Sequence, residues 1–136
     1  METELARGSH IIFINDLHPQ DDAEFKLFPP HCTEGSADTE IIPELAGING
    51  EIICKTRHSA FFQTKLEERL KEIKPGKLII CGVCTDICVY FTAADAWNRD
   101  YIVEVPVNCV ASFHEKAHEF ALKHMEKILA VKLTSI

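Results

Sequence analysis

The sequence predicts an α/β domain in which helices cover a parallel β-sheet. Short runs rich in Ile and Val alternate with longer segments of helical periodicity, a pattern typical of parallel sheets. The 136 residues suit one domain, and the hydrophobic share of 46% is a globular value. Because no linker, repeat or low-complexity segment divides the sequence, we expect residues 1–136 to form a single domain.

The first half of the chain is predicted to hold two strands separated by a long loop. Residues 1–7 form a short helix that Gly8 ends, and Ile11–Asn15 reads as a strand buried on both faces. The segment 16–50 has no periodicity and contains several prolines, so it is expected to be a loop with at most a short helical turn. A loop of this length is usually functional or disordered. Glu51–Lys55 is the second predicted strand.

The second half alternates helices and strands regularly. The predicted elements are a helix at 62–73 ended by Pro75-Gly76, a strand at 77–83, a helix at 85–98, a strand at 101–107, a helix at 113–128 and a strand at 130–133. Ligands of parallel sheets bind beyond the carboxyl ends of the strands. Asp16, Lys55 and residues 83–88 follow such ends, so we expect the site there.

Charge and cysteine content narrow the function classes. The net charge of −7 argues against nucleic-acid binding, which needs a basic surface. No apolar run approaches the roughly 18 residues of a membrane span. The acidic N-terminus lacks the apolar segment of a signal peptide, which predicts a cytoplasmic protein. In that compartment the six cysteines are expected to be free thiols.

Cys88 is the candidate nucleophile. It lies in the segment 82–89, where a strand is predicted to run through a tight turn into a helix that Thr85 or Asp86 can cap. In the first turn of a helix, the dipole and unpaired N–H groups favour a thiolate and can stabilise an oxyanion. The alternative for any single cysteine is a small buried hydrophobic residue.

Three other patterns have ordinary structural explanations. Lys55 ends a strand, where lysine is usually solvated, although its ammonium would lower the pKa of a nearby thiol. Cys81 and Cys84 form a C-x-x-C pair, which leaves a redox or zinc site as a minor alternative. His114 and His118 have the spacing of a metal pair but no third ligand, so a polar helix face is expected.

A metal site is the candidate function of the long loop. Asp16 and His18 point the same way if the chain is extended between them, so both can bind one cation. Glu24 and His31 follow in the same loop. Two histidines and two carboxylates suit Zn²⁺, Fe²⁺ or Mn²⁺. Asp-x-His pairs are common by chance, so this pattern alone is a weak signal.

Four segments together resemble the isochorismatase-like cysteine hydrolases, and the nicotinamidases among them most of all. The matching segments occur in the family's order and are residues 15–18, 27–32, 55–61 and 82–89. The resemblance covers essentially the whole chain. It implies a three-layer α/β/α fold with a parallel sheet.

The resemblance implies a role for each matching position. Cys88 matches the nucleophile and Lys55 the catalytic lysine. The Val83–Cys84 peptide matches a cis bond that turns the Cys84 amide toward an oxyanion, beside the amide of Cys88. The implied metal is zinc, with iron or manganese as alternatives, and its implied ligands are Asp16, His18, His31 and, as in some nicotinamidases, Glu24.

The implied reaction is the hydrolysis of nicotinamide to nicotinic acid and ammonia, a step of NAD salvage, through a thioester. The partner is therefore a small-molecule amide, with Phe28 against its ring and Phe61 as a second wall. Members of the family are commonly oligomers, so the resemblance allows a homo-oligomer, which this sequence neither shows nor excludes. The first alternative is another isochorismatase-like hydrolase, such as a carbamoyl-amide hydrolase.

The second alternative is a non-catalytic protein. The family places its catalytic Asp at the end of an earlier, central strand, and no strand is predicted before Ile11–Asn15. Residues 4–8 match the tail of the family's first helix, so the resemblance implies a chain that begins inside that helix. Loss of a general base removes roughly 10²–10⁴ of rate. We therefore expect a shortened version of the enzyme or a binding remnant.

Overall fold

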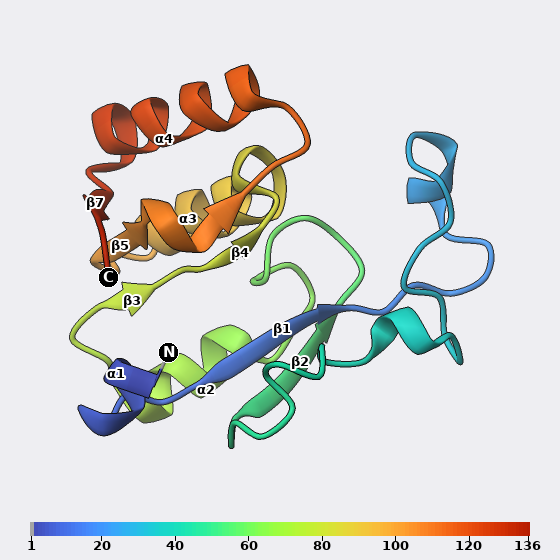
Figure 1. Ribbon diagram of the computed structural model, residues 1–136, viewed down its shortest axis with the longest axis horizontal. Helices are drawn as coiled ribbons and strands as arrows, with labels where there is room; N and C mark the ends of the chain where they lie inside the picture. The colour runs from blue at the N-terminus through green and yellow to red at the C-terminus, as the bar shows by residue number, and fades with distance from the viewer. Residues whose placement is uncertain (1) are drawn as a thin grey trace. The chain divides into compact units, whose positions relative to one another are not determined.

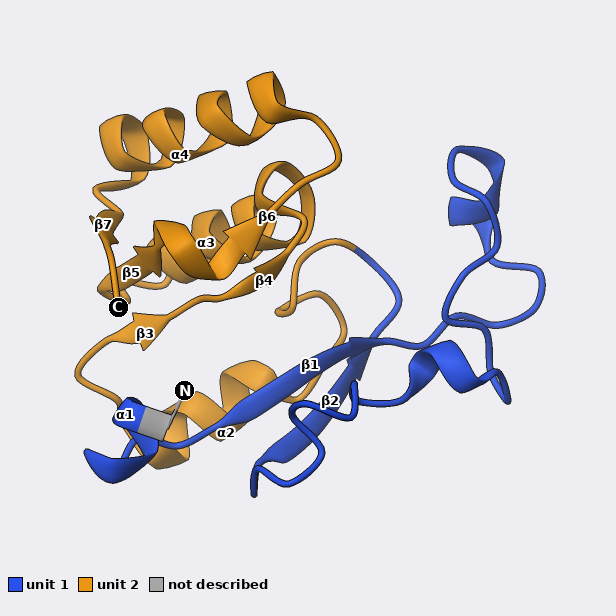
Figure 2. Cartoon of the chain, viewed as in Figure 1, with its two compact units in different colours: residues 1–57 blue, residues 58–136 orange. Residues whose placement is uncertain are grey.

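A computed structural model describes residues 2–136 of the chain (Figure 1). The chain divides into two compact units, residues 1–57 and residues 58–136, and each is described by itself (Figure 2). The pairings between strands are parallel in both units. The predicted α/β class is therefore confirmed. None of the helices in residues 2–136 has the length and apolar character needed to cross a membrane.

The unit of residues 1–57 is built on a pair of parallel strands. Its elements are α1 (Glu2–Ala6), β1 (Ile12–Asp16), the 3₁₀ helices η1 (Ala23–Lys26) and η2 (Ala37–Thr39), and β2 (Glu51–Lys55). The register places Asp16 beside Lys55, so both strands end at the same level. Gly8 has a φ of 79° and follows α1, as predicted. Glycine adopts this conformation without steric cost.

Two details of this unit differ from the sequence prediction. Strand β1 was expected to be buried on both faces, but among its residues only Phe13 is buried. In the described sheet β1 has β2 as its ladder partner on one side, which leaves its other residues half-buried. The long loop is present but contains two 3₁₀ helices, η1 and η2, where at most one short helical turn was expected. An isolated parallel bridge joins His18 near the start of the loop to Thr33 near its middle.

The unit of residues 58–136 has two small parallel sheets, three α-helices and two shorter helical turns. Its strands form the orders β3-β5-β7 and β4-β6. The elements are α2 (Leu66–Ile73), β3 (Leu78–Ile79), β4 (Gly82–Val83), η3 (Thr85–Val89), α3 (Tyr90–Trp97), β5 (Val103–Pro106), η4 (Val107–Cys109), β6 (Val110–Ala111), α4 (Glu115–Leu129) and β7 (Lys132–Thr134).

The core of this unit lies where α3 and α4 pack on each other and on the sheet. Strand β5 is buried along its whole length. Ala93, Ala96 and Met125 have no exposed surface and line the helix contact. Small side chains on α3 allow this close approach.

The strand predicted at 77–83 is interrupted. Residues Leu78–Ile79 pair with β5, whereas Gly82–Val83 pair with β6. Gly82 has a φ of 115°, and the chain changes partner there. A run of apolar residues predicts a strand but does not reveal such a change of partner.

Candidate functional site

The carboxyl ends of β1 and β2 hold the first two candidate residues. Asp16 ends β1 and Lys55 ends β2, and the Lys55 ammonium donates a hydrogen bond to Asp16 Oδ1. The side chain of Lys55 is 5% exposed, whereas that of Asp16 is 27% exposed. Lysines at strand ends are usually solvated, but the structure shows Lys55 buried. A lysine buried to this degree needs a carboxylate partner.

His18 lies two residues beyond β1 and is completely buried. Its Nδ1 is 3.1 Å from Asp22 Oδ2. Within the described residues, the one buried side-chain nitrogen or oxygen without a hydrogen-bond partner is Nε2 of His18. Such a buried, unsatisfied atom is costly, and a metal ion is one of the partners that removes the cost.

Asp22 is held as a carboxylate by its surroundings. Its Oδ1 accepts from the backbone N–H of Glu24 at 2.8 Å, and Arg57 Nη1 donates to both carboxylate oxygens. These hydrogen bonds, the backbone one first, and the hydrogen bond with His18 lower the pKa of Asp22 to about 2. A carboxylate can only accept, so His18 donates through Nδ1, and in the neutral imidazole the lone pair is then on Nε2.

His31 has the same arrangement with a different acceptor. Its Nδ1 lies 2.8 Å from the backbone oxygen of Pro29, so in the neutral imidazole the lone pair is again on Nε2. The rings of His18 and His31 meet edge to face, with centroids 4.9 Å apart. Phe25 packs against both rings.

Asp16, His18 and His31 form a cluster that fits a metal ion. Each offers one ligand atom, and these atoms lie within 4.8 Å of one another. Two imidazole nitrogens and one carboxylate oxygen suit Zn²⁺, with room for a further ligand. Glu24 lies outside this cluster, although its Oε1 is 3.9 Å from His31 Nε2. Its role as a fourth ligand stays a prediction.

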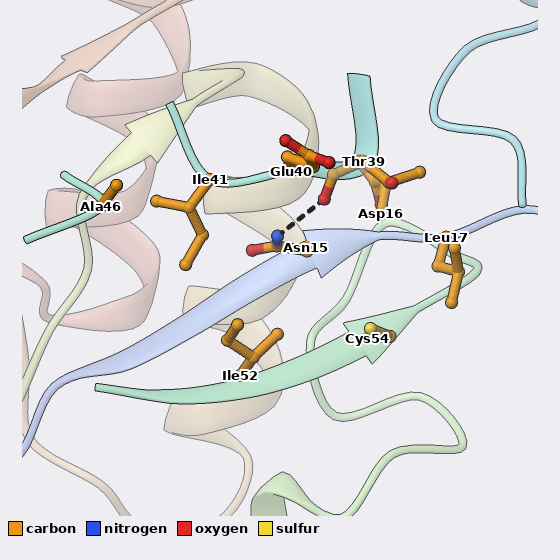
Figure 3. A pocket seen from close by; sticks show the side chains of 9 residues that line it. All are labelled: Asn15, Asp16, Leu17, Thr39, Glu40, Ile41, Ala46, Ile52 and Cys54. Atoms are coloured by element: carbon orange, nitrogen blue, oxygen red, sulfur yellow. Dashed lines mark hydrogen bonds between the residues drawn. The ribbon is translucent and has the colours of Figure 1, made fainter. Parts of the chain in front are cut away.

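An open pocket of about 500 Å³ adjoins the same strands (Figure 3). It is lined by Asn15, Asp16, Leu17, Thr39, Glu40, Ile41, Ala46, Ile52 and Cys54. Asn15 donates to the backbone oxygen of Thr39 at 3.1 Å and so holds the long loop over the strands. Asp16 is thus shared between the pocket and the cation cluster.

In the unit of residues 58–136, Cys88 lies in the turn that follows β4. The Val83–Cys84 peptide is cis, as the resemblance implied. The next residues form a π-helical turn, η3, before α3 begins at Tyr90. The Cys84 carbonyl accepts from the N–H groups of Ile87 and Val89, both at 3.1 Å. Cys88 is therefore in the first turn of the helical segment, as predicted.

The predicted helix cap is wrong. Cys84 is the N-cap residue and makes no side-chain cap. Thr85 and Asp86 instead contact the region of α4: His118 Nδ1 lies 2.8 Å from Thr85 Oγ1, and Ser112 donates to Asp86. Because α4 packs against η3, these polar side chains find partners there rather than at their own helix end.

A sequence model of the isochorismatase domain matches residues 4–136. The chain belongs to the isochorismatase family. The family protein YaaI of Bacillus subtilis is 36% identical over 126 residues, which cover 92% of this chain and 69% of YaaI. The crystal structure of nicotinamidase PncA from Bacillus subtilis is 34% identical with a TM-score of 0.90, and the match covers 98% of this chain and 79% of PncA.

A second solved structure of the family contains a metal. The pyrazinamidase of Pyrococcus horikoshii in complex with zinc is 26% identical with a TM-score of 0.92. The match covers 99% of this chain and 80% of that enzyme. The fold is thus that of isochorismatase-family hydrolases. Family membership leaves the substrate open, because the family includes hydrolases of different substrates.

The surroundings of Cys84 shift the pKa of its thiol. Burial, followed by the negative charges of Cys88 and Asp86, raises its pKa above the ordinary 9.0. Cys84 therefore stays protonated at neutral pH, which leaves its backbone amide as the group with a predicted role.

The two predicted substrate aromatics lie in different surroundings. Phe28 is half-buried, and its backbone N–H donates to Glu24. Phe61 is buried, stacks with Tyr101 at 6.4 Å and lies under the Arg99 guanidinium. These contacts give Phe61 a packing role, and both substrate roles stay predictions.

Sequence reasoning missed Asp22 and Arg57. Asp22 follows His18 by four residues, and Arg57 follows Lys55 by two. The spacing of four residues between His18 and Asp22 was the available signal. Both residues lie in an irregular loop, where no helical or strand periodicity singles out such a pair.

Proposed function

We propose that the chain is a nicotinamidase-type amidohydrolase that converts nicotinamide and water to nicotinic acid and ammonia. The observation that supports it is that Nε2 of the buried His18 has no hydrogen-bond partner, while the ligand atoms of His18, Asp16 and His31 lie within 4.8 Å of one another. A zinc ion bound there would act as a Lewis acid that holds the pyridine nitrogen and orients the ring. The resemblance to nicotinamidases supplies the reaction.

In this proposal Cys88 is the nucleophile. Its thiolate forms a bond to the carboxamide carbon, and the backbone amides of Cys84 and Cys88 donate to the oxyanion. The C–N bond then breaks as the nitrogen accepts a proton from water, so that ammonia leaves and hydroxide and a thioester remain. Hydroxide attacks the thioester, which yields nicotinic acid and returns the Cys88 thiolate. Lys55 takes the role of the family's lysine, which stabilises negative charge.

Two other functions remain as alternatives. Another isochorismatase-family hydrolase would share Cys88 and Lys55 but act on a different substrate. A non-catalytic protein would bind zinc and pyridine amides without turnover. The cation cluster favours nicotinamide over the first alternative, because a pyridine nitrogen is a good zinc ligand.

The test is the release of ammonia and nicotinic acid from nicotinamide by the zinc-loaded chain. We expect turnover by the parent, loss of at least about 10³-fold in Cys88→Ala, and parent-like turnover in Cys109→Ala, a matched thiol removal in the same unit. Parent-like turnover in Cys88→Ala would contradict the nucleophile.

The same assay separates the alternatives. Hydrolysis of a carbamoyl amide but not of nicotinamide identifies another hydrolase of the family. Zinc binding with no hydrolysis of either substrate identifies a non-catalytic protein.

A further inference from the structure

A series of polar contacts runs from Arg57, whose side chain is 41% exposed, through the buried Asp22 to the buried His18. We propose that Asp22, held by Arg57, is a positioning residue that fixes the imidazole of His18 so that Nε2 faces the cation. This inference rests on the proposed metal centre and adds two residues to it. Asp22 and Arg57 act through His18 and touch neither metal nor substrate.

The geometry of the three side chains is well defined. Asp22 Oδ2 is 3.1 Å from His18 Nδ1, and Arg57 Nη1 is 2.9 Å and 3.1 Å from the two oxygens of Asp22. The side chain of Asp22 is 3% exposed and that of His18 is fully buried. Water therefore has little access to replace the contact between Asp22 and His18, whereas Arg57 is partly open to solvent.

A neutral imidazole carries one proton, on either of its two nitrogens. A carboxylate at Nδ1 places the proton there, and the lone pair is then on Nε2, which is the ligand atom. Without that carboxylate the proton can occupy Nε2, and the ring can rotate. Moving the proton back to Nδ1 and reorienting the ring would then cost free energy, which would weaken metal binding.

His31 provides an internal comparison. Its Nδ1 is fixed by the backbone oxygen of Pro29, at 2.8 Å, which no side-chain substitution removes. His18 depends on a side chain instead. Substitution at Asp22 therefore changes one of the two histidines and leaves the other in place.

Asp22 also has a purely structural role, which the experiment must separate. Its Oδ1 caps the 3₁₀ helix η1 by accepting from the N–H of Glu24. An asparagine retains one acceptor oxygen and can serve either the cap or His18, whereas an alanine serves neither. Asp21 is exposed and adjacent, so Asp21→Asn removes the same charge from the same loop as a matched control.

The first measurement is the protonation of the His18 ring nitrogens in the metal-free chain, by ¹⁵N NMR. We expect the Nδ1–H form in the parent and in Asp21→Asn, and a population of the Nε2–H form in Asp22→Ala. This readout needs no metal. A parent with the Nε2–H form overturns the inference, as does an Asp22→Ala spectrum identical to that of the parent.

The second measurement is the zinc dissociation constant, from titration against a competing chelator. We expect about 10- to 100-fold weaker binding in Asp22→Ala, a smaller loss in Asp22→Asn and in Arg57→Gln, and none in Asp21→Asn. Arg57→Gln keeps the cap and the carboxylate, so it tests the contact if Asp22→Ala does not fold. Zinc affinity equal to that of the parent in both Asp22→Ala and Arg57→Gln overturns the inference. A parent that binds no zinc overturns the metal centre itself.

Discussion

Lys55 shows how burial turns an ordinary residue into a candidate for chemistry. A lysine at a strand end is usually solvated, but this one is 6% exposed and paired with Asp16. Burying an ammonium is costly unless a carboxylate compensates it. The burial of Lys55 and its pairing with Asp16 therefore support it as a candidate for a role in the reaction rather than as an ordinary solvated side chain.

Replacing Lys55 tests this assignment. Lys55→Met keeps most of the side-chain volume but removes the charge, and we expect nicotinamide turnover to fall by at least about 10²-fold. Steady-state ammonia release measures it. Lys65→Met, at an exposed position before α2, is the control and should retain activity. Unchanged turnover in Lys55→Met would mean that the lysine has no part in the reaction.

The residues of the cluster were predictable to different degrees. Asp16, His18 and His31 follow from residue type and position after a strand, and the structure brings their ligand atoms together. Asp22 and Arg57 were not predictable, because 35 residues separate them and only the folded loop makes them neighbours. Contacts of this kind leave no periodic trace in a sequence.

At the scale of elements, the boundaries of strands were predicted best where a strand pairs with a single neighbouring strand along its whole length. Strand β2 is found where it was predicted, at Glu51–Lys55, and β1 is displaced by one residue. The helix predicted at 62–73 begins only at Leu66, because Gln63 has a φ of 53° and Thr64 Oγ1 accepts from the N–H of Leu66. Side-chain hydrogen bonds to the backbone compete with helix at such positions.

Gly50 is required by the close packing at the start of β2. A Cβ added there would lie 2.7 Å from a ring carbon of Phe13 and 3.0 Å from Ile11. Phe13 is part of the core, so its ring has little room to move. We expect Gly50→Ala to lower the free energy of unfolding by about 1–3 kcal/mol.

Urea unfolding measures this loss, with Gly47→Ala as the control. Gly47 has open space around its Cα, so its substitution should be neutral or slightly stabilising. A Gly50→Ala chain as stable as the parent would show that Phe13 can shift at no cost.

At the scale of the whole molecule, the pH dependence of stability has one identifiable contributor in the three-stranded sheet. Glu104 on β5 accepts from Lys77 at 2.8 Å and from Lys132 at 3.2 Å, and so ties β5 to both flanking segments. These hydrogen bonds, that of Lys77 first, lower the pKa of Glu104 below its ordinary 4.5. A carboxyl group whose pKa is lowered in the folded state stabilises the fold at pH values above its unfolded-state pKa. This stabilisation is lost as the pH falls through the folded-state pKa.

We therefore expect Glu104→Gln to be less stable than the parent at pH 7, by about 1 kcal/mol. The difference should shrink as pH falls from 7 to about 3, since protonation removes the charge from the parent as well. Urea titrations of both chains across this range measure it. A stability difference that does not change with pH would rule out the ion pairs as its cause.

The family assignment fixes the fold and the class of hydrolase, and the cation cluster supports the substrate proposal. The most direct test is the zinc content of the purified chain and of His31→Ala, by elemental analysis after incubation with zinc and removal of free metal. We predict one zinc ion per parent chain and little or none in His31→Ala. A parent without zinc, or a variant with as much zinc as the parent, would contradict the metal centre.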